Sequence, residues 1–148
     1  MKIEKIFIHC TATIEGQDLG AKDIDRWHRQ KGWNGIGYHY VVKLDGSVEK
    51  GRPDNVMGAH VRGYNRNSLG VTYVGGLNTL KAPADTRTDA QKEALLKLLK
   101  ELKQKHPRAT ILGHRDVSKD RNNNGIIEPF EWMKHCPCFD AIPEYKHI

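Results

Sequence analysis

Strand-like and helix-like segments alternate along this chain of 148 residues. The second helical pattern begins at Thr88, whose side chain can form a capping box with Gln91. Alternating elements are typical of α/β proteins, so we expect a single domain over residues 1–148, with a central mixed β-sheet flanked by helices. Apolar runs predict strands at 5–10, within 35–44, and at 47–50, 68–74 and 110–113, and amphipathic patterns predict helices at 21–30 and 88–105.

A tight hairpin is predicted where Asp45-Gly46 separates two of the strand patterns. On the first strand of this hairpin, alternation of side chains would place Tyr38, Tyr40 and Val42 on one face. Glycines lie near Tyr38 in the sequence and leave room beside it, which makes its hydroxyl a candidate for a functional role.

The segment 51–67 is polar and glycine-rich and shows neither a strand nor a helix pattern. A loop of this length in a compact domain is usually functional or mobile. Its residues His60, Tyr64 and Asn65 offer hydrogen-bonding and stacking groups. We therefore predict that the loop forms a cleft wall and that these three residues bind substrate, with an ordinary surface loop as the alternative.

The charge balance is basic, with 24 lysines and arginines against 18 acidic residues and a net charge of +6. Such a charge attracts polyanions, which include nucleic acid, anionic membranes and anionic cell walls, and it equally fits a solvated basic surface. No apolar run approaches the ~20 residues that cross a bilayer, so we expect no membrane insertion. The apolar run 6–8 is too short for a signal peptide, and we expect synthesis in the cytoplasm.

Metal-ligating side chains are concentrated between His114 and Asp140. This stretch contains His135, Cys136 and Cys138 as well as His114. The chain has 3 cysteines, which cannot all pair, and a disulfide between two cysteines separated by a single residue is strained. Histidine nitrogen and cysteine sulfur are ligands that zinc prefers, so metal ligation is the better prediction.

A further ligand is expected from the first strand. His9 and Cys10 are neighbours near its end and point to opposite faces, so they cannot easily serve one site. We assign His9 to the functional face and Cys10 to the core. His114 follows the last strand, and ligands in α/β sheets gather at the ends of strands.

His9, His114 and one cysteine, either Cys136 or Cys138, make a three-ligand zinc set. Three protein ligands leave the fourth position open for water, which is typical of a catalytic site. If His135 supplied a fourth ligand, the site would instead be structural.

The segment 120–131 matches the twelve-residue calcium loop of EF hands, with Gly125 at the sharp turn. No entering helix is predicted before it, and two of the side-chain ligands are neutral asparagines, so any calcium affinity should be weak. The alternative is an Asn-Gly turn with incidental acids. We treat 120–131 as a loop insertion into the domain and as a candidate calcium site. Its predicted ligands are Asp120, Asn122, Asn124, the carbonyl of Ile126, and Glu131.

A series of short motifs, in order across nearly the whole chain, resembles a known family. The series is similar to the zinc-dependent N-acetylmuramoyl-L-alanine amidases of the phage lysozyme type, whose superfamily includes the peptidoglycan recognition proteins. The motifs are His9-Cys10-Thr11-Ala12-Thr13, Gly37-Tyr38-His39-Tyr40, Gly58-Ala59-His60, Gly63-Tyr64-Asn65, Gly75-Gly76 and Lys134-His135-Cys136-Pro137-Cys138-Phe139-Asp140.

The resemblance implies that His9, His114 and Cys136 hold zinc and that Tyr38 and Lys134 are the catalytic partners. It favours Cys136 because the matching cysteine of the family directly precedes the proline. His114 and Cys136 lie further apart in this sequence than in the compact phage members, and the calcium-like loop fills the difference. That loop must therefore fold back for Cys136 to reach the metal.

Amide hydrolysis is consistent with these residue types. Zinc polarises a carbonyl and lowers the pKa of bound water to about 7. Lys134 would stabilise the oxyanion or protonate the leaving amine, and Tyr38 would donate a hydrogen bond or orient the water.

The resemblance implies that the bond joins N-acetylmuramic acid to L-alanine in peptidoglycan, and that the protein is a phage or prophage endolysin that acts on the wall after release. We expect a monomer with no nucleic-acid partner.

Two other functions belong to different classes. One is a module that recognises peptidoglycan without cutting it, but relatives of that kind typically lack the cysteine ligand, and this sequence retains Cys136. The other is regulation of a phage polymerase by protein contact, which similar phage lysozymes add to amidase activity. No feature of the sequence bears on that second alternative.

Overall fold

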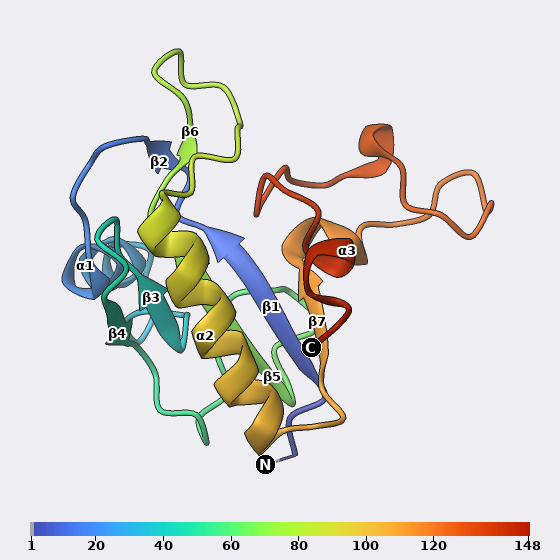
Figure 1. Ribbon diagram of the computed structural model, residues 1–148, viewed down its shortest axis with the longest axis horizontal. Coiled ribbons are helices and arrows are strands. Elements are labelled where there is room, and N and C mark those ends of the chain that lie inside the picture. Colours follow the sequence, from blue (N-terminus) through green and yellow to red (C-terminus); the bar gives the residue numbers. More distant parts are fainter. Residues whose placement is uncertain (1) are drawn as a thin grey trace.

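The computed structural model describes residues 2–148. The elements are β1 (Lys5–Cys10), β2 (Thr13–Ile14), α1 (Ala21–Gln30), β3 (Tyr40–Val42), β4 (Val48–Lys50), β5 (Ser68–Tyr73), β6 (Gly76–Leu77), α2 (Asp89–Lys105), β7 (Thr110–Gly113), η1 (His114–Val117), η2 (Pro129–Glu131) and α3 (Ala141–Tyr145). Five strands form the central sheet in the order β4-β3-β5-β1-β7, and β2 pairs with β6 separately (Figure 1). Neighbouring strands are parallel except for the antiparallel pair β3 and β4. The prediction of an α/β fold with a central mixed sheet is confirmed.

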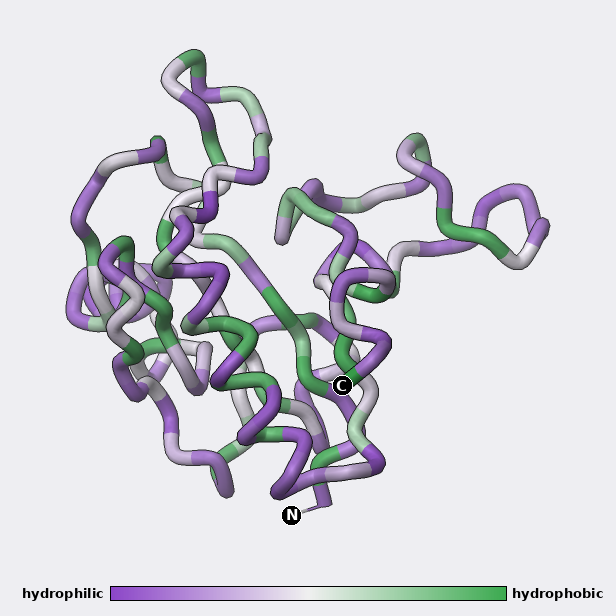
Figure 2. Tube along the Cα trace, in the orientation of Figure 1, coloured by the Kyte–Doolittle hydropathy of each residue, from purple (hydrophilic) through white to green (hydrophobic). Residues whose placement is uncertain are grey.

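Helix α2 covers one face of the central sheet (Figure 1). Apolar residues recur along α2 between hydrophilic ones (Figure 2), and Leu95 and Leu99 pack in the same buried cluster as Ile6 of β1. Full burial of each such side chain contributes about 1.5–3 kcal/mol. Cys10 belongs to this cluster, while His9 alternates with it and lies on the opposite face, as predicted.

The start of α2 confirms the predicted capping box. The Thr88 hydroxyl accepts from the Gln91 backbone N–H at 3.1 Å, and the Gln91 side chain accepts from the Thr88 N–H at 2.9 Å. Gln91 is fully buried, and its amide also donates to the carbonyls of Val42 and Val74. These bonds tie the helix to the sheet. No helix within residues 2–148 is long and apolar enough to cross a membrane.

The predicted hairpin forms between β3 and β4, with Gly46 at a φ of +87° in the turn. The expectation that Tyr38 shares a face with Tyr40 and Val42 is wrong. The strand begins only at Tyr40, and Tyr38 packs against the cluster that contains Val41, on the other side from Tyr40 and Val42. A second backbone segment lies against Tyr38, since a Cβ on Gly51 would lie 2.1 Å from the Tyr38 carbonyl oxygen.

The insertion between η1 and α3 extends away from the sheet and then returns to it (Figure 1). At its return, the backbone N–H of Cys10 donates to Cys136 Sγ at 3.1 Å. The loop therefore folds back to β1, as the ligand prediction requires.

Candidate functional site

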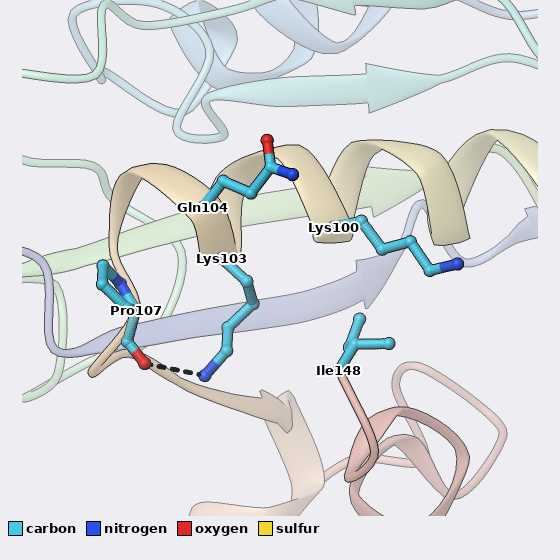
Figure 3. A pocket seen from close by; sticks show the side chains of 5 residues that line it. All are labelled: Lys100, Lys103, Gln104, Pro107 and Ile148. Carbon is cyan, nitrogen blue, oxygen red and sulfur yellow. Dashed lines mark hydrogen bonds between the residues drawn. The ribbon is translucent and has the colours of Figure 1, made fainter.

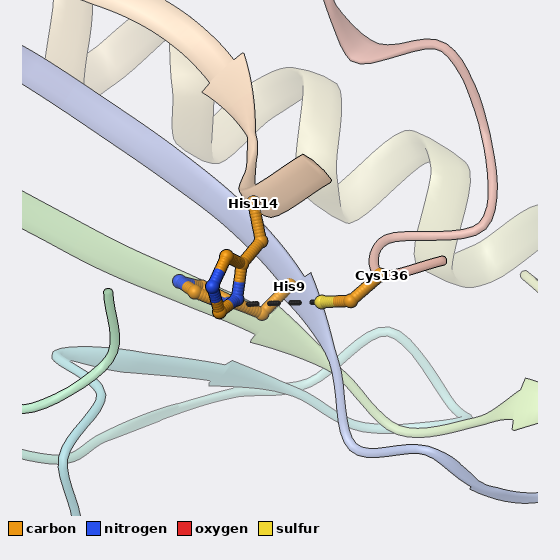
Figure 4. Close-up of side chains that lie close together, drawn as sticks. All are labelled: His9, His114 and Cys136. Atoms are coloured by element: carbon orange, nitrogen blue, oxygen red, sulfur yellow. Dashed lines mark hydrogen bonds between the residues drawn. The ribbon is translucent and has the colours of Figure 1, made fainter. Parts of the chain in front are cut away.

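Three side chains that could hold a metal ion converge where β1 and β7 end. His9 lies near the end of β1, His114 opens η1 directly after β7, and Cys136 lies on the returning segment (Figure 4). One donor atom from each lies within 4.8 Å of the other two, and His9 Nδ1 is 3.8 Å from Cys136 Sγ. Nitrogen and sulfur ligands of a tetrahedral zinc are separated by about 3.6 Å, so the donor set fits zinc and leaves one position open.

The structure places Cys136, and neither Cys138 nor His135, beside the two histidines. The thiol of Cys138 contacts Cys10 Sγ at 3.9 Å and the Gly76 carbonyl at 3.4 Å, on the core side of β1. His135 is exposed, and its ring packs edge-on against a tryptophan. The cysteine that precedes the proline is therefore the one positioned to bind metal.

Both histidines of the group are almost fully buried. Burial, reinforced by the charge of Lys134, lowers the pKa of His114 to about 4. Burial also holds the pKa of His9 well below its ordinary value, with further contributions from His60, His114 and Lys134. Neutral imidazoles retain the lone pair that metal ligation needs.

A third histidine supports His9 from the side away from the cysteine. His9 Nε2 and His60 Nδ1 lie 2.9 Å apart, and His60 Nε2 is 3.3 Å from the Ser68 hydroxyl. With Nδ1 of His9 as the ligand atom, the proton resides on Nε2 and is donated to His60. Such a partner fixes the tautomer and the ring orientation of a metal-ligating histidine.

Replacing His60 with alanine is expected to weaken metal binding by about 10–100-fold, because the orientation of His9 is no longer held. Zinc affinity measured by competition with a chelating dye checks this prediction. The measurement also separates two roles for His60. If His60 only bound substrate, its replacement would raise KM and leave zinc affinity unchanged.

The predicted catalytic partners, Tyr38 and Lys134, line the same cavity as the three candidate ligands, and this cavity has a volume of about 260 Å³. The ring of Tyr38 lies 5.0 Å from that of His9. Burial raises the pKa of Tyr38, so its hydroxyl stays protonated and can donate a hydrogen bond. The lining residues are His9, Cys10, Thr11, Ala12, Trp27, His28, Lys31, Trp33, Tyr38, Ala59, His60, His114, Lys134 and Cys136.

The loop 51–67 forms part of this cavity through His60. The two other predicted substrate-binding residues belong to the same loop but do not line the cavity. The Asn65 side chain accepts from the backbone N–H groups of His60 and Val61, both at 2.8 Å, and so shapes the loop. The ring of Tyr64 packs edge-on against Phe7 at 6.1 Å. Substrate binding by these three residues stays a prediction.

Sequence reasoning missed one wall of the cavity. Trp27, His28, Lys31 and Trp33 line it from the end of α1 and the turn that follows. The rings of His28 and Trp33 lie 4.5 Å apart, and Lys31 Nζ is 5.4 Å from the Trp33 ring centre. Aromatic residues at helical spacing predict core packing. The same pattern does not indicate whether a cavity lies beside them.

The calcium-like loop is held by its own hydrogen bonds. The Glu131 carboxylate, 1% exposed, accepts from the backbone N–H groups of Glu128 and Arg121. Asp120 accepts from the Gly125 N–H at 2.8 Å. Neither these contacts nor the comparisons below support calcium binding, which stays a prediction.

A larger depression of about 500 Å³ lies at the C-terminal end of α2 (Figure 3). Of its two lysines, Lys103 donates to the carbonyls of Pro107 and Ala109 at 3.2 and 2.8 Å. This side chain therefore ties the turn that follows α2 back to the helix, and we assign no chemistry to the depression.

Comparisons with known proteins identify the family of this chain. The family model described as N-acetylmuramoyl-L-alanine amidase matches residues 1–129. The chain is 40% identical over 136 residues to the endolysin of Klebsiella phage KP32, covering 92% of this chain and 81% of that protein. It is 38% identical over 138 residues to the endolysin of Escherichia phage T7, covering 93% and 82%. Among solved structures, the N-acetylmuramoyl-L-alanine amidase LysC from Clostridium intestinale matches with a TM-score of 0.73 and 26% identity, covering 97% of this chain and 81% of that one.

Proposed function

The chain belongs to the N-acetylmuramoyl-L-alanine amidase family, and from this premise we propose that it is an endolysin that uses zinc to hydrolyse the amide between N-acetylmuramic acid and L-alanine. Endolysin relatives at about 40% identity span most of the chain and support the peptidoglycan amidase activity. Zinc dependence and the roles of individual residues are the finer parts of the proposal.

One observation supports those finer parts above all. His9, His114 and Cys136 place their donor atoms together, and Tyr38 and Lys134 line the same cavity. A metal in this group would act as a Lewis acid on the amide carbonyl and would activate a water molecule. An amide is a poor electrophile, so this chemistry is what the reaction most needs.

The side chains around the group supply the remaining functions. The ammonium group of Lys134 stabilises negative charge on the carbonyl oxygen or protonates the leaving amine. The protonated hydroxyl of Tyr38 donates a hydrogen bond to the same developing charge. No aspartate or glutamate is among the residues that line the cavity, so its charged side chains, Lys31 and Lys134, are both cationic. That charge, with the net charge of +6, suits an anionic cell-wall substrate.

Amine release from purified peptidoglycan tests the proposal directly. The full chain is expected to create new L-alanine amino termini, to stop doing so after a chelator removes the metal, and to recover when zinc is added back. Magnesium added back in the same amount is the control, because it prefers oxygen ligands and fits this donor set poorly.

The outcomes separate the competing functions. Amine release that persists in a chelated, metal-free protein would contradict the zinc proposal. A zinc-loaded protein that binds the wall and releases no amines would instead be a recognition module, with Lys134 and Tyr38 as binding residues.

A further inference from the structure

Arg115 is a buried cation that directly follows the ligand His114. Its guanidinium donates to Asp140 at 2.5 Å and to the His135 carbonyl at 3.3 Å. The same group lies 3.7 Å from the centre of the Trp132 ring. One side chain thus makes three contacts with the returning segment 132–140.

These contacts lie on both sides of Cys136 in the sequence. Trp132 and His135 precede it and Asp140 follows it, and the backbone N–H of Arg115 donates to the Cys136 carbonyl itself at 3.0 Å. Arg115 therefore connects the backbone that carries His114 to the backbone that carries Cys136.

The insertion before this segment makes such a connection necessary. Residues 118–128 form no helix or strand, and fixing an irregular chain costs conformational entropy of about 1–2 kcal/mol per residue. Other bonds hold the segment at single points: besides the Cys10 and Gly76 contacts of the two cysteines, Met133 N–H donates to the Ser118 hydroxyl at 3.0 Å and the Tyr73 hydroxyl donates to the Pro137 carbonyl at 2.6 Å. None of these bonds contacts the segment on both sides of the cysteine.

We propose that Arg115 is a positioning residue that holds Cys136 at the metal and Lys134 at the cavity, and that it thereby sets metal affinity and turnover. The inference rests on the proposed function, because it concerns the same metal group. Arginine suits this task since its planar fork bonds two acceptors while its face stacks on an aromatic ring. Lysine keeps the charge and cannot reproduce that geometry.

The chain offers a matched control in Arg87. This guanidinium is also buried, pairs with Asp85 and Glu144, and lies 3.4 Å from the centre of the Phe139 ring. None of its hydrogen bonds goes to residues 132–140, and its contact with that segment is the ring of Phe139, which follows Cys136. Arg87→Lys should therefore lower stability in a similar way while leaving the metal group unchanged.

The test uses Co²⁺ as a spectroscopic probe in the full chain, because a cobalt–thiolate bond gives a charge-transfer absorption that reports Cys136 coordination. Arg115→Lys is expected to bind cobalt about 10–100-fold more weakly than wild type and to show a weaker thiolate band. Its kcat and kcat/KM should fall together while KM stays near the wild-type value. Asp140→Asn, a change at an exposed side chain, should shift affinity in the same direction by less.

The results test the role of Arg115 separately from the proposed metal-dependent function. If Arg115→Lys loses stability as Arg87→Lys does but keeps wild-type cobalt affinity and the full thiolate band, Arg115 serves the fold alone and the inference is wrong. If the wild-type chain binds neither cobalt nor zinc, the metal proposal itself fails and this inference fails with it.

Discussion

Replacing Cys136 with serine is expected to abolish both metal binding and peptidoglycan cleavage. A serine hydroxyl does not ionise near neutral pH, so two neutral histidines would remain as the only protein ligands. The loss of zinc affinity should exceed the factor of about 100 that marks the upper range for residues that only orient a ligand. Zinc content after dialysis, together with amine release from purified peptidoglycan, measures both effects.

The second cysteine of the motif provides the control for this change. Cys138→Ser alters a thiol that contacts Cys10 and the Gly76 carbonyl, away from the two histidines. That variant should keep its zinc. Full zinc occupancy in the Cys136→Ser protein would show instead that Cys138 or His135 is the ligand.

Replacing Lys134 with methionine is expected to lower kcat by about 10²–10³-fold while leaving zinc affinity near the wild-type value. A fall in kcat of this size is typical when one group that stabilises charge in the transition state is removed. Methionine retains an unbranched apolar chain of similar length and removes only the ammonium charge. Steady-state kinetics and a zinc titration on the same preparation separate turnover from metal binding.

Lys119→Met is the matched control, because Lys119 is an exposed lysine of the same insertion that does not line the cavity. It should leave kcat unchanged. If Lys134→Met also turned over at the wild-type rate, Lys134 would have no part in the chemistry.

Much of the fold was predictable because its signals are local. The capping box at Thr88 and Gln91, the Asp45-Gly46 turn and the alternation around His9 depend on residues a few positions apart. The error at Tyr38 has the opposite origin. The strand begins only at Tyr40, and the backbone at Tyr38 lies close to a second segment at Gly51, a contact that residues next to Tyr38 in the sequence do not encode.

The site divides in the same way. The donor types and the resemblance to an amidase family were visible in the sequence, since zinc chemistry restricts the choice to a few residue kinds. The cavity wall formed by Lys31 and Trp33 was not, because a cavity exists only between packed elements.

The sequence alone limits the chemistry that is available, because it supplies two histidines, a cysteine before a proline, a lysine and a tyrosine in motifs that resemble one enzyme family. Tertiary structure decided which atoms meet. Only the folded chain sets Cys136 at the histidines and Cys138 in the core, places His60 against His9, and returns the insertion through Arg115. The physical reason is that side-chain type is encoded position by position, whereas a separation of a few ångströms between remote residues results from packing of the whole sheet, its helices and the loops that close over them.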